Sequence, residues 1–265
     1  IALSLVGSEM CIRDSYDPEF ILAYLSASIV VYLLATAVAM FKNKPSSEAA
    51  VEAQCSVIGN VGFLGIPMLA ILMGAKAVGF IMIILAVDLI VFGSLIILII
   101  VVSKDKKLDI FLFYRLLIGL LKNPMIVSII CGLLWSASGW SLPGPVSDFI
   151  IMLGSAATPG ALFAIGASLA QKSAEKFETA AWLSFCKLVL HPLAVCVAVF
   201  YVFEVELYAA TVMIAAASLP VAGNIFMVAE HYNVAPKRAS AAIFLSTVFS
   251  IFTVSFTIAW VSSIN

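Results

Sequence analysis

Three ionisable residues lie deep inside long apolar stretches of the sequence, where a full charge is costly. Lys187 lies midway along the apolar stretch 179–203, and His191 follows it by one helical turn and so faces the same way. Asp88 lies inside another such stretch, 77–103. A charge at the centre of a bilayer costs roughly 2.5–3.5 kcal/mol on insertion scales, so a charged residue there is a functional candidate by default.

Each of these three residues has more than one chemical role open to it. Lys187 could pair with a substrate, act as a fixed cation or titrate, and we expect it to face protein or an aqueous cavity rather than lipid. His191 is a candidate proton carrier, although a hydrogen-bonded structural histidine beside Pro192 is the favoured interpretation. Asp88 could be a proton or cation site, or it could form a structural ion pair with Lys187.

Two clusters of helix-breaking residues interrupt otherwise apolar stretches. Residues 56–67 read Ser-Val-Ile-Gly-Asn-Val-Gly-Phe-Leu-Gly-Ile-Pro, and residues 217–224 read Ala-Ser-Leu-Pro-Val-Ala-Gly-Asn. Such residues break the backbone hydrogen-bond ladder of a helix, which is tolerated in a membrane only against protein or a water-filled cavity. We expect non-helical backbone near Gly62–Pro67 and Pro220–Asn224, with the two segments approaching each other. Simple kinks are the alternative.

Interrupted helices offer a way to hold an anion without a full positive charge. Their N–H ends carry partial positive charge, and Asn60 and Asn224 each add a donor and an acceptor. The alternative is that both asparagines only satisfy freed backbone groups. The predicted substrate-binding residues are Asn60, Asn224, Gly59, Pro67, Pro220, Gly223 and Lys187, and the candidates for ion or proton coupling are Asp88 and His191.

The composition favours lipid as the solvent of much of the chain. Hydrophobic residues make up 63% of it and charged residues 11%, against about 25% charged residues in a soluble domain. The net charge of −1 and the scattered Lys and Arg residues give no sign of nucleic-acid binding. The five cysteines lack metal-ligand spacing, so we expect no metal and no cofactor. The sequence also lacks paired intramembrane aspartates and a His-Glu-x-x-His motif, which argues against an intramembrane enzyme.

The chain is therefore predicted to be an all-α polytopic membrane protein. Lys and Arg residues fall in loops on one side of the predicted spans, eleven against the single Lys76 on the other. Cytoplasmic loops of membrane proteins carry the excess of Lys and Arg residues. We therefore expect both ends of the eight-span unit to be extracytoplasmic and the protein to lie in the cell (inner) membrane. The eight predicted spans are 19–41, 56–73, 77–103, 120–139, 147–171, 179–203, 207–229 and 239–262.

The two interrupted spans are five apart, which predicts inverted five-helix repeats with two crossing broken helices. Spans 120–139 and 147–171 then lack partners, so we expect eight of ten helices here. Residues 16–107 would be the remainder of the first repeat, with three helices, and 108–265 the second, with five. Residues 1–15 look like an artefactual, non-native segment and are left out of this scheme.

Several stretches resemble the auxin efflux carrier family of permeases, in its bacterial branch. They are Gly-Asn-Val-Gly-Phe-Leu-Gly-Ile-Pro (59–67), Thr-Pro-Gly-Ala-Leu-Phe-Ala-Ile-Gly-Ala-Ser-Leu-Ala (158–170), Lys187 with His191-Pro192, Leu-Pro-Val-Ala-Gly-Asn-Ile-Phe-Met-Val-Ala (219–229) and Asn123-Pro124. The resemblance implies a fold similar to bile-acid symporters and sodium/proton antiporters, with the substrate at the crossing of the broken helices. One departure is Ile225, which stands where the plant carriers have a proline.

The resulting prediction is a secondary transporter of a small organic anion that works by alternating access. The bacterial branch suggests a dicarboxylate such as malonate, and the plant relatives suggest a homodimer. H⁺ and Na⁺ are both candidate coupling ions. A channel-like or sensory membrane protein is the alternative function, with an intramembrane enzyme a weaker one.

Overall fold

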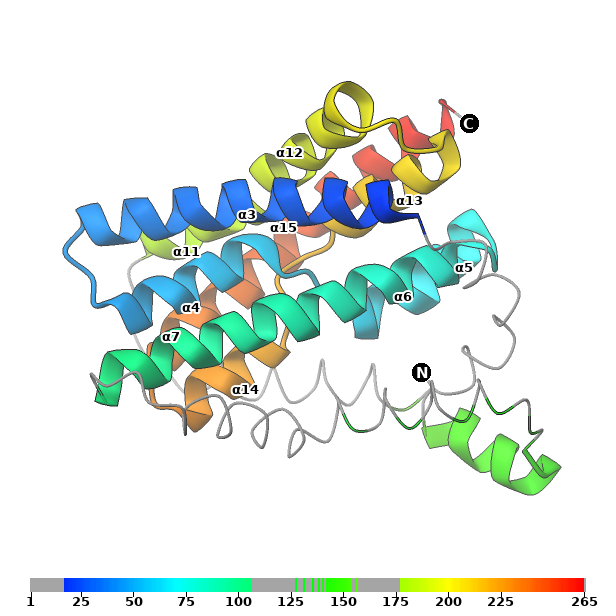
Figure 1. Cartoon of the computed structure of the whole chain (residues 1–265), viewed down its shortest axis with the longest axis horizontal. Helices are drawn as coiled ribbons and strands as arrows, with labels where there is room; N and C mark the ends of the chain where they lie inside the picture. The colour runs from blue at the N-terminus through cyan, green and yellow to red at the C-terminus, as the bar shows by residue number, and fades with distance from the viewer. Residues whose placement is uncertain are drawn as a thin grey trace.

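The computed structural model describes residues 17–105, 142–153 and 177–264, with a few isolated positions between them. These parts are mostly helical (Figure 1), and their only β-type pairing is one isolated bridge, between Gly59 and Val221. Expected span 120–139 and most of expected span 147–171 lie outside the described residues, apart from the helix Gly144–Leu153. Segment 1–15 lies outside them as well.

Four helices of the described residues are long and apolar enough to cross a membrane. The first is α3, where Asp17 Oδ1 accepts a hydrogen bond from the Glu19 N–H at 2.9 Å and Pro18 occupies the first turn. Both features are favourable helix starts. Two others contain π-helical segments (η). The four are α3 (Pro18–Phe41), α6–η2–α7 (Ala77–Val87, Asp88–Phe92, Gly93–Asp105), α11–η3–α12–η4 (Phe177–Phe185, Cys186–Leu190, His191–Val197, Ala198–Val202) and α15 (Pro236–Ser262).

Two further helical passages are interrupted, as the breaker residues predict. The first consists of α4 (Ser46–Val57), η1 (Val61–Gly65) and α5 (Ile66–Met73), and the second of α13 (Leu207–Ala217) and α14 (Asn224–His231). In the second passage the break lies between Ala217 and Asn224, where we expect it.

In the first passage the expected position of the break is wrong. The chain is helical over Val61–Met73 and leaves the helix at Ile58–Asn60 instead. Pro67 fits because it lies in the first turn of α5, where a missing N–H needs no helical partner.

The predicted start of the first interrupted passage is also wrong, by ten residues. The sequence predicts a span from residue 56, whereas α4 begins at Ser46 and contains Glu52, which is only 3% exposed. Arg238 of α15 makes this burial possible, since its guanidinium donates to Glu48 Oε2 at 3.0 Å and to Glu52 Oε1 at 2.7 Å. Glu52, which lies outside the spans predicted from the sequence, is therefore an ion-paired carboxylate in the protein interior.

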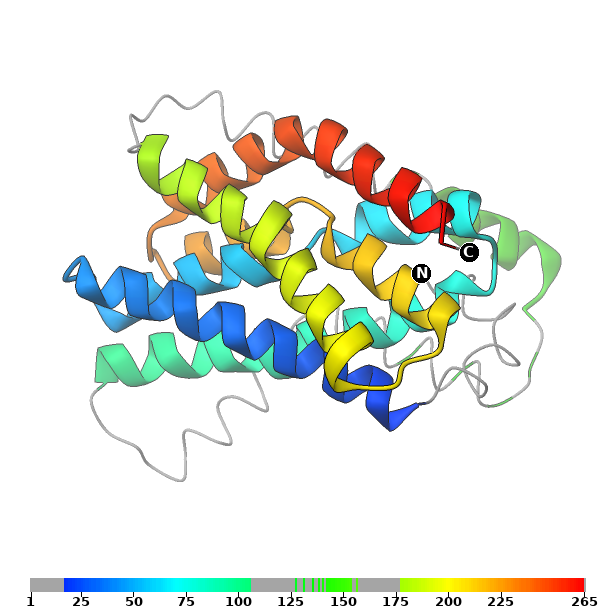
Figure 2. The same ribbon diagram turned by 90° about the horizontal axis from the view of Figure 1, so that it is seen from above.

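The helices pack into two hydrophobic cores, one on each side of the interruptions. One core joins the first half of α3 to α5, α6, α12 and α13, and the other joins the second half of α3 to α4, α7, α11, α14 and α15. The long helices run along the longest dimension of the described bundle (Figures 1 and 2). The interruptions therefore lie between two hydrophobic cores, which the continuous helices such as α3 connect.

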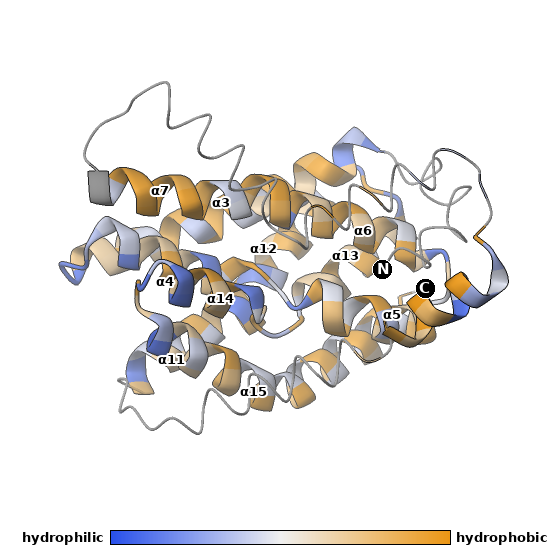
Figure 3. Cartoon of the chain, turned by 90° about the horizontal axis from the view of Figure 1, so that it is seen from below, coloured by the Kyte–Doolittle hydropathy of each residue, from blue (hydrophilic) through white to orange (hydrophobic). Residues whose placement is uncertain are grey.

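The outer faces of the long helices are apolar. Large hydrophobic side chains such as Leu33 of α3 (61% exposed) and Phe252 of α15 (73% exposed) have no protein cover in the described structure, and hydrophobic residues predominate along these helices (Figure 3). Such faces suit acyl chains, since water would penalise them. The prediction of an all-α, multi-pass membrane protein is confirmed at this level.

Candidate functional site

The two interruptions meet and pair their backbones. The Asn60 N–H donates to the Pro220 carbonyl at 2.7 Å, and the Ala222 N–H donates to the Ile58 carbonyl at 3.1 Å. Residues 58–60 and 220–222 thus form a short antiparallel bridge, which satisfies backbone groups that the broken helices leave free. The predicted approach of the two segments is confirmed.

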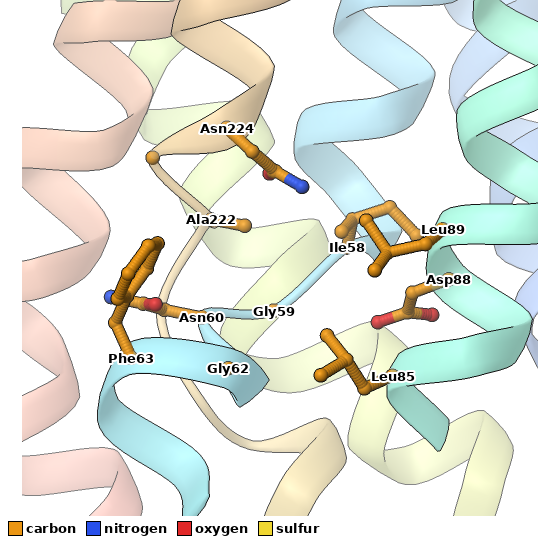
Figure 4. A pocket seen from close by; sticks show the side chains of 11 residues that line it. Ile58, Gly59, Asn60, Gly62, Phe63, Leu85, Asp88, Leu89, Ala222 and Asn224 are labelled. Carbon is orange, nitrogen blue, oxygen red and sulfur yellow. The ribbon is translucent and has the colours of Figure 1, made fainter. Parts of the chain in front are cut away.

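A pocket lies against this bridge and contains three of the polar side chains singled out from the sequence. Asn60, just before η1, Asn224 of α14 and Asp88 of η2 all line it, but in Figure 4 the Asn60 amide lies beside Phe63 and points away from the Asn224 and Asp88 side chains. Asp88 Oδ2 and Asn224 Oδ1 are buried oxygens without a hydrogen-bond partner among the described residues. Buried polar atoms normally have partners, so these two acceptor oxygens are available to a hydrogen-bond donor or a cation that enters the pocket. The lining residues are Ile58, Gly59, Asn60, Gly62, Phe63, Leu85, Asp88, Leu89, Ala222, Gly223 and Asn224.

Lys187 lies behind the bridge rather than in the pocket. Its ammonium group donates to the Ala217 carbonyl, at the C-terminal end of α13, and lies 3.2 Å from His191 Nδ1. A helix C-terminus carries partial negative charge, so the ammonium stabilises this end of the interruption. A Cβ atom on Gly59 would lie 3.2 Å from Lys187 Cε and 3.3 Å from Nζ. Gly59 therefore lets the backbone pass close over the lysine.

A chain of buried polar side chains runs from Lys187 towards Asp88. Because the Lys187 ammonium can only donate, His191 Nδ1 accepts, so Nε2 carries the proton and donates to Ser28 Oγ at 3.0 Å. Tyr24, one turn before Ser28 on α3, packs edge-on against the His191 ring and donates its hydroxyl to Asp88 Oδ1 at 2.8 Å. The chain links the two buried charges, which make no direct ion pair among the described residues.

The structure brings most of the predicted site residues together. Asn60, Asn224, Gly59, Gly223 and Asp88 all line the pocket, and Pro220 contributes its carbonyl to the bridge.

Three other predicted residues lie outside the pocket lining. Pro67 is exposed, in the first turn of α5. Lys187 and His191 are both 0% exposed, so Lys187 faces protein and not lipid, as predicted. Lys187 and His191 are therefore in a position to support the bridge rather than to contact a molecule in the pocket.

Tyr24 and Ser28 belong to this site and are absent from the sequence-based set. Both are almost fully buried in the described structure, at 1% and 0% exposure. One signal was available, because tyrosine favours membrane interfaces and Tyr24 lies well inside span 19–41. Ser28 gives no such signal, because a serine hydroxyl readily hydrogen-bonds to a backbone carbonyl of its own helix.

A further feature common to Asp88 and Lys187 is the local helix geometry. Asp88 begins η2, and Lys187 lies in η3. Wider π-helical turns are frequent at functional sites. Their presence at both buried charges agrees with a site assembled around the bridge.

Comparison with known proteins gives the same class as the resemblance in the sequence. The family described as "Membrane transport protein" matches residues 16–258. A curated protein of Rhizobium meliloti (strain 1021) named "Putative malonate transporter" is 27% identical over 242 residues, which are 89% of this chain and 75% of the relative. The chain therefore belongs to the membrane transport protein family, that of the auxin efflux carriers, and is a membrane transporter.

Proposed function

We propose that this protein is a secondary transporter of a small organic dicarboxylate, with malonate as the first candidate, bound where the two interruptions meet. Asn60 and Asn224 would donate their amide N–H groups to the carboxylates. The observation that carries the proposal is that two asparagines, from two separate broken helices, line one pocket at the bridge. The name of the Rhizobium relative supports the substrate class.

The electrostatics of the pocket support an anionic substrate. η1 and α14 both begin at the bridge, so their partly positive N-terminal ends lie beside the pocket. Lys187 adds a full positive charge close behind Gly59. A carboxylate would thus be stabilised by helix ends, amides and the Lys187 charge behind the bridge, without a direct ion pair that would slow its release.

The arrangement also suits alternating access. The two interrupted passages, α4–η1–α5 and α13–α14, would be equivalent parts of two inverted repeats, with α3 matching α11–η4 and α6–α7 matching α15. Each half of the bundle has its own hydrophobic core. Because α3 and the passages α6–η2–α7 and α11–η3–α12–η4 run through both cores, the movement would be of one group of whole helices against another about the bridge, which is how transporters of this kind expose one site to either side.

Replacement of the two asparagines tests the binding site. Asn60→Ala and Asn224→Ala should each weaken malonate binding to the purified protein about tenfold to a hundredfold, since a hydrogen bond to a charged group contributes about 1.5–3 kcal/mol. The melting temperature should change little. Isothermal titration and thermal unfolding in detergent measure the two quantities on the same samples.

Gln54→Ala is the matched control for these variants. Gln54 is a buried amide of α4 that does not line the pocket, and its Oε1 has no partner among the described residues. Its removal should leave malonate affinity unchanged. If the two asparagine variants lose stability but keep their affinity, the asparagines only support the broken backbone and the proposed site is wrong.

A further inference from the structure

The proposed substrate is an anion, and the pocket contains a carboxyl group, Asp88, that is also negative when ionised. Binding therefore requires that the repulsion between the two be removed. Asp88 is 2% exposed and lines the same pocket as Asn60 and Asn224. Lys187, the buried cation whose charge acts on this carboxylate, makes its hydrogen bonds to the Ala217 carbonyl and His191 instead. An ionised Asp88 would therefore stand beside an incoming carboxylate without a cation between them. Like charges in a low-dielectric site strongly disfavour such an arrangement.

The two oxygens of Asp88 have different surroundings. Oδ1 accepts the Tyr24 hydroxyl of α3 at 2.8 Å, whereas Oδ2 has no partner in the described structure. The other titratable groups facing this region are His191, whose ring packs against Tyr24, and Lys187 beyond it, and neither is hydrogen-bonded to Asp88. Oδ2 is thus the atom that is free to take a proton, while Tyr24 holds the carboxyl group in place.

A proton on Oδ2 would change Asp88 from a repelling group into a hydrogen-bond donor. A protonated carboxyl has one O–H donor, and in this pocket that donor would face the substrate carboxylate. The proton comes from the aqueous side on which the pocket is open and leaves to the other side with the substrate. No covalent bond to carbon forms or breaks, and the carboxylate of Asp88 is restored after each cycle.

We infer that Asp88 makes transport proton-coupled: the anion binds only when Asp88 Oδ2 is protonated, so about one proton crosses with each substrate molecule. The inference rests on the proposed function and adds the coupling ion to it. It selects H⁺ over Na⁺, because only two buried side-chain oxygens of the described pocket lining, Asp88 Oδ2 and Asn224 Oδ1, lack a partner, which is fewer than the oxygen ligands that hard cations normally gather.

Asp88→Asn tests the coupling directly. Asparagine resembles the protonated carboxyl in shape and charge and still accepts the Tyr24 hydroxyl. Wild-type protein in liposomes should take up malonate about tenfold more slowly for each pH unit of rise once Asp88 is mostly ionised. A pH-sensitive dye inside the vesicles should report about one proton per malonate. Asp88→Asn should bind malonate, lose the pH dependence and carry no proton.

Two controls separate this test from other effects. Both proteins meet the same substrate, so ionisation of malonate itself affects them equally. Glu206→Gln removes an exposed carboxylate of the Lys76–Glu206 pair, outside the pocket, and should behave as wild type. Replacing Na⁺ by choline should change nothing.

Three results would overturn the inference, and they are distinguishable. Wild-type malonate uptake without proton movement refutes the coupling and leaves the proposed function intact. Uptake that needs Na⁺ assigns the coupling to sodium instead. If wild-type protein neither binds nor moves malonate, the proposed substrate is wrong and the inference falls with it.

Discussion

At the residue scale, the bridge packs against one buried lysine, Lys187, and depends on it. Lys187 is completely buried and is held by the Ala217 carbonyl and by His191. A buried ammonium is tolerated only when it is hydrogen-bonded and its charge is compensated. The C-terminal end of α13 provides this compensation, so the lysine and the break in the helix stabilise each other.

This contact gives a prediction for Gly59. In Gly59→Ala, the added Cβ would lie 3.2 Å from Lys187 Cε and would force the lysine to shift. The shift strains its two hydrogen bonds, so we expect a loss of about 1–3 kcal/mol in unfolding free energy. Gly144→Ala is the control, because no atom lies within 4 Å of its added Cβ. Equal melting temperatures for the two variants in detergent would argue against this packing.

Single residues with unusual properties could be recognised from the sequence, and their partners could not. Asp88 and Lys187 are visible because isolated charges in apolar stretches need a reason. Their connection through Tyr24, Ser28 and His191 depends on three helices meeting side by side. Ser28 and His191 are separated by 163 residues in the chain. No local pattern encodes such a contact, so the direct ion pair between Asp88 and Lys187 that we considered does not form.

At the element scale, the interruption in α13–α14 is fixed from outside by α15. Ser246 Oγ accepts the Val221 N–H at 3.1 Å and donates to the Ile243 carbonyl of its own helix at 3.1 Å. Val221 is the bridge partner of Gly59. A single hydroxyl therefore satisfies the backbone of the bridge on the side away from the pocket.

Removal of this hydroxyl should destabilise the bridge. Ser246→Ala leaves the buried Val221 N–H without an acceptor, so we expect a loss of about 1–3 kcal/mol in unfolding free energy. Amide hydrogen exchange at Val221 should also become faster. Ser255→Ala is matched on the same helix, since Ser255 is exposed and bonds only to the Ile251 carbonyl; its effect should stay within about 0.5 kcal/mol. Unchanged exchange in Ser246→Ala would contradict this role.

The breaker residues identify which helices are interrupted, but they locate only one of the two breaks. Pro67 can be accommodated in a first turn, so the chain resumes its helix before the proline rather than after it. The position of the break is set instead by the pairing of Ile58 and Asn60 with the other segment. That pairing is a tertiary contact and overrides local propensity.

At the scale of the whole molecule, the two ends of the described bundle differ in their Lys and Arg residues: Lys42, Lys44, Lys237 and Arg238 lie at one end and Lys76 at the other. At one end Lys44, Arg238, Glu48 and Glu52 form a linked group of ion pairs between α4, α15 and the turn after α3. At the other end Lys76 and Glu206 form an exposed pair at 3.8 Å. We propose that the first end is cytoplasmic, because cytoplasmic loops carry the excess of Lys and Arg.

Counterflow shows whether this molecule carries malonate or a similar dicarboxylate through a saturable site at the bridge. Liposomes containing the protein are loaded with unlabelled malonate and diluted into a trace of labelled malonate. A carrier predicts that labelled malonate transiently accumulates inside above its equilibrium level, that this accumulation saturates with external malonate, and that Asn224→Ala weakens it. A channel would show neither accumulation nor saturation, and that result, or the absence of malonate movement, would contradict the account.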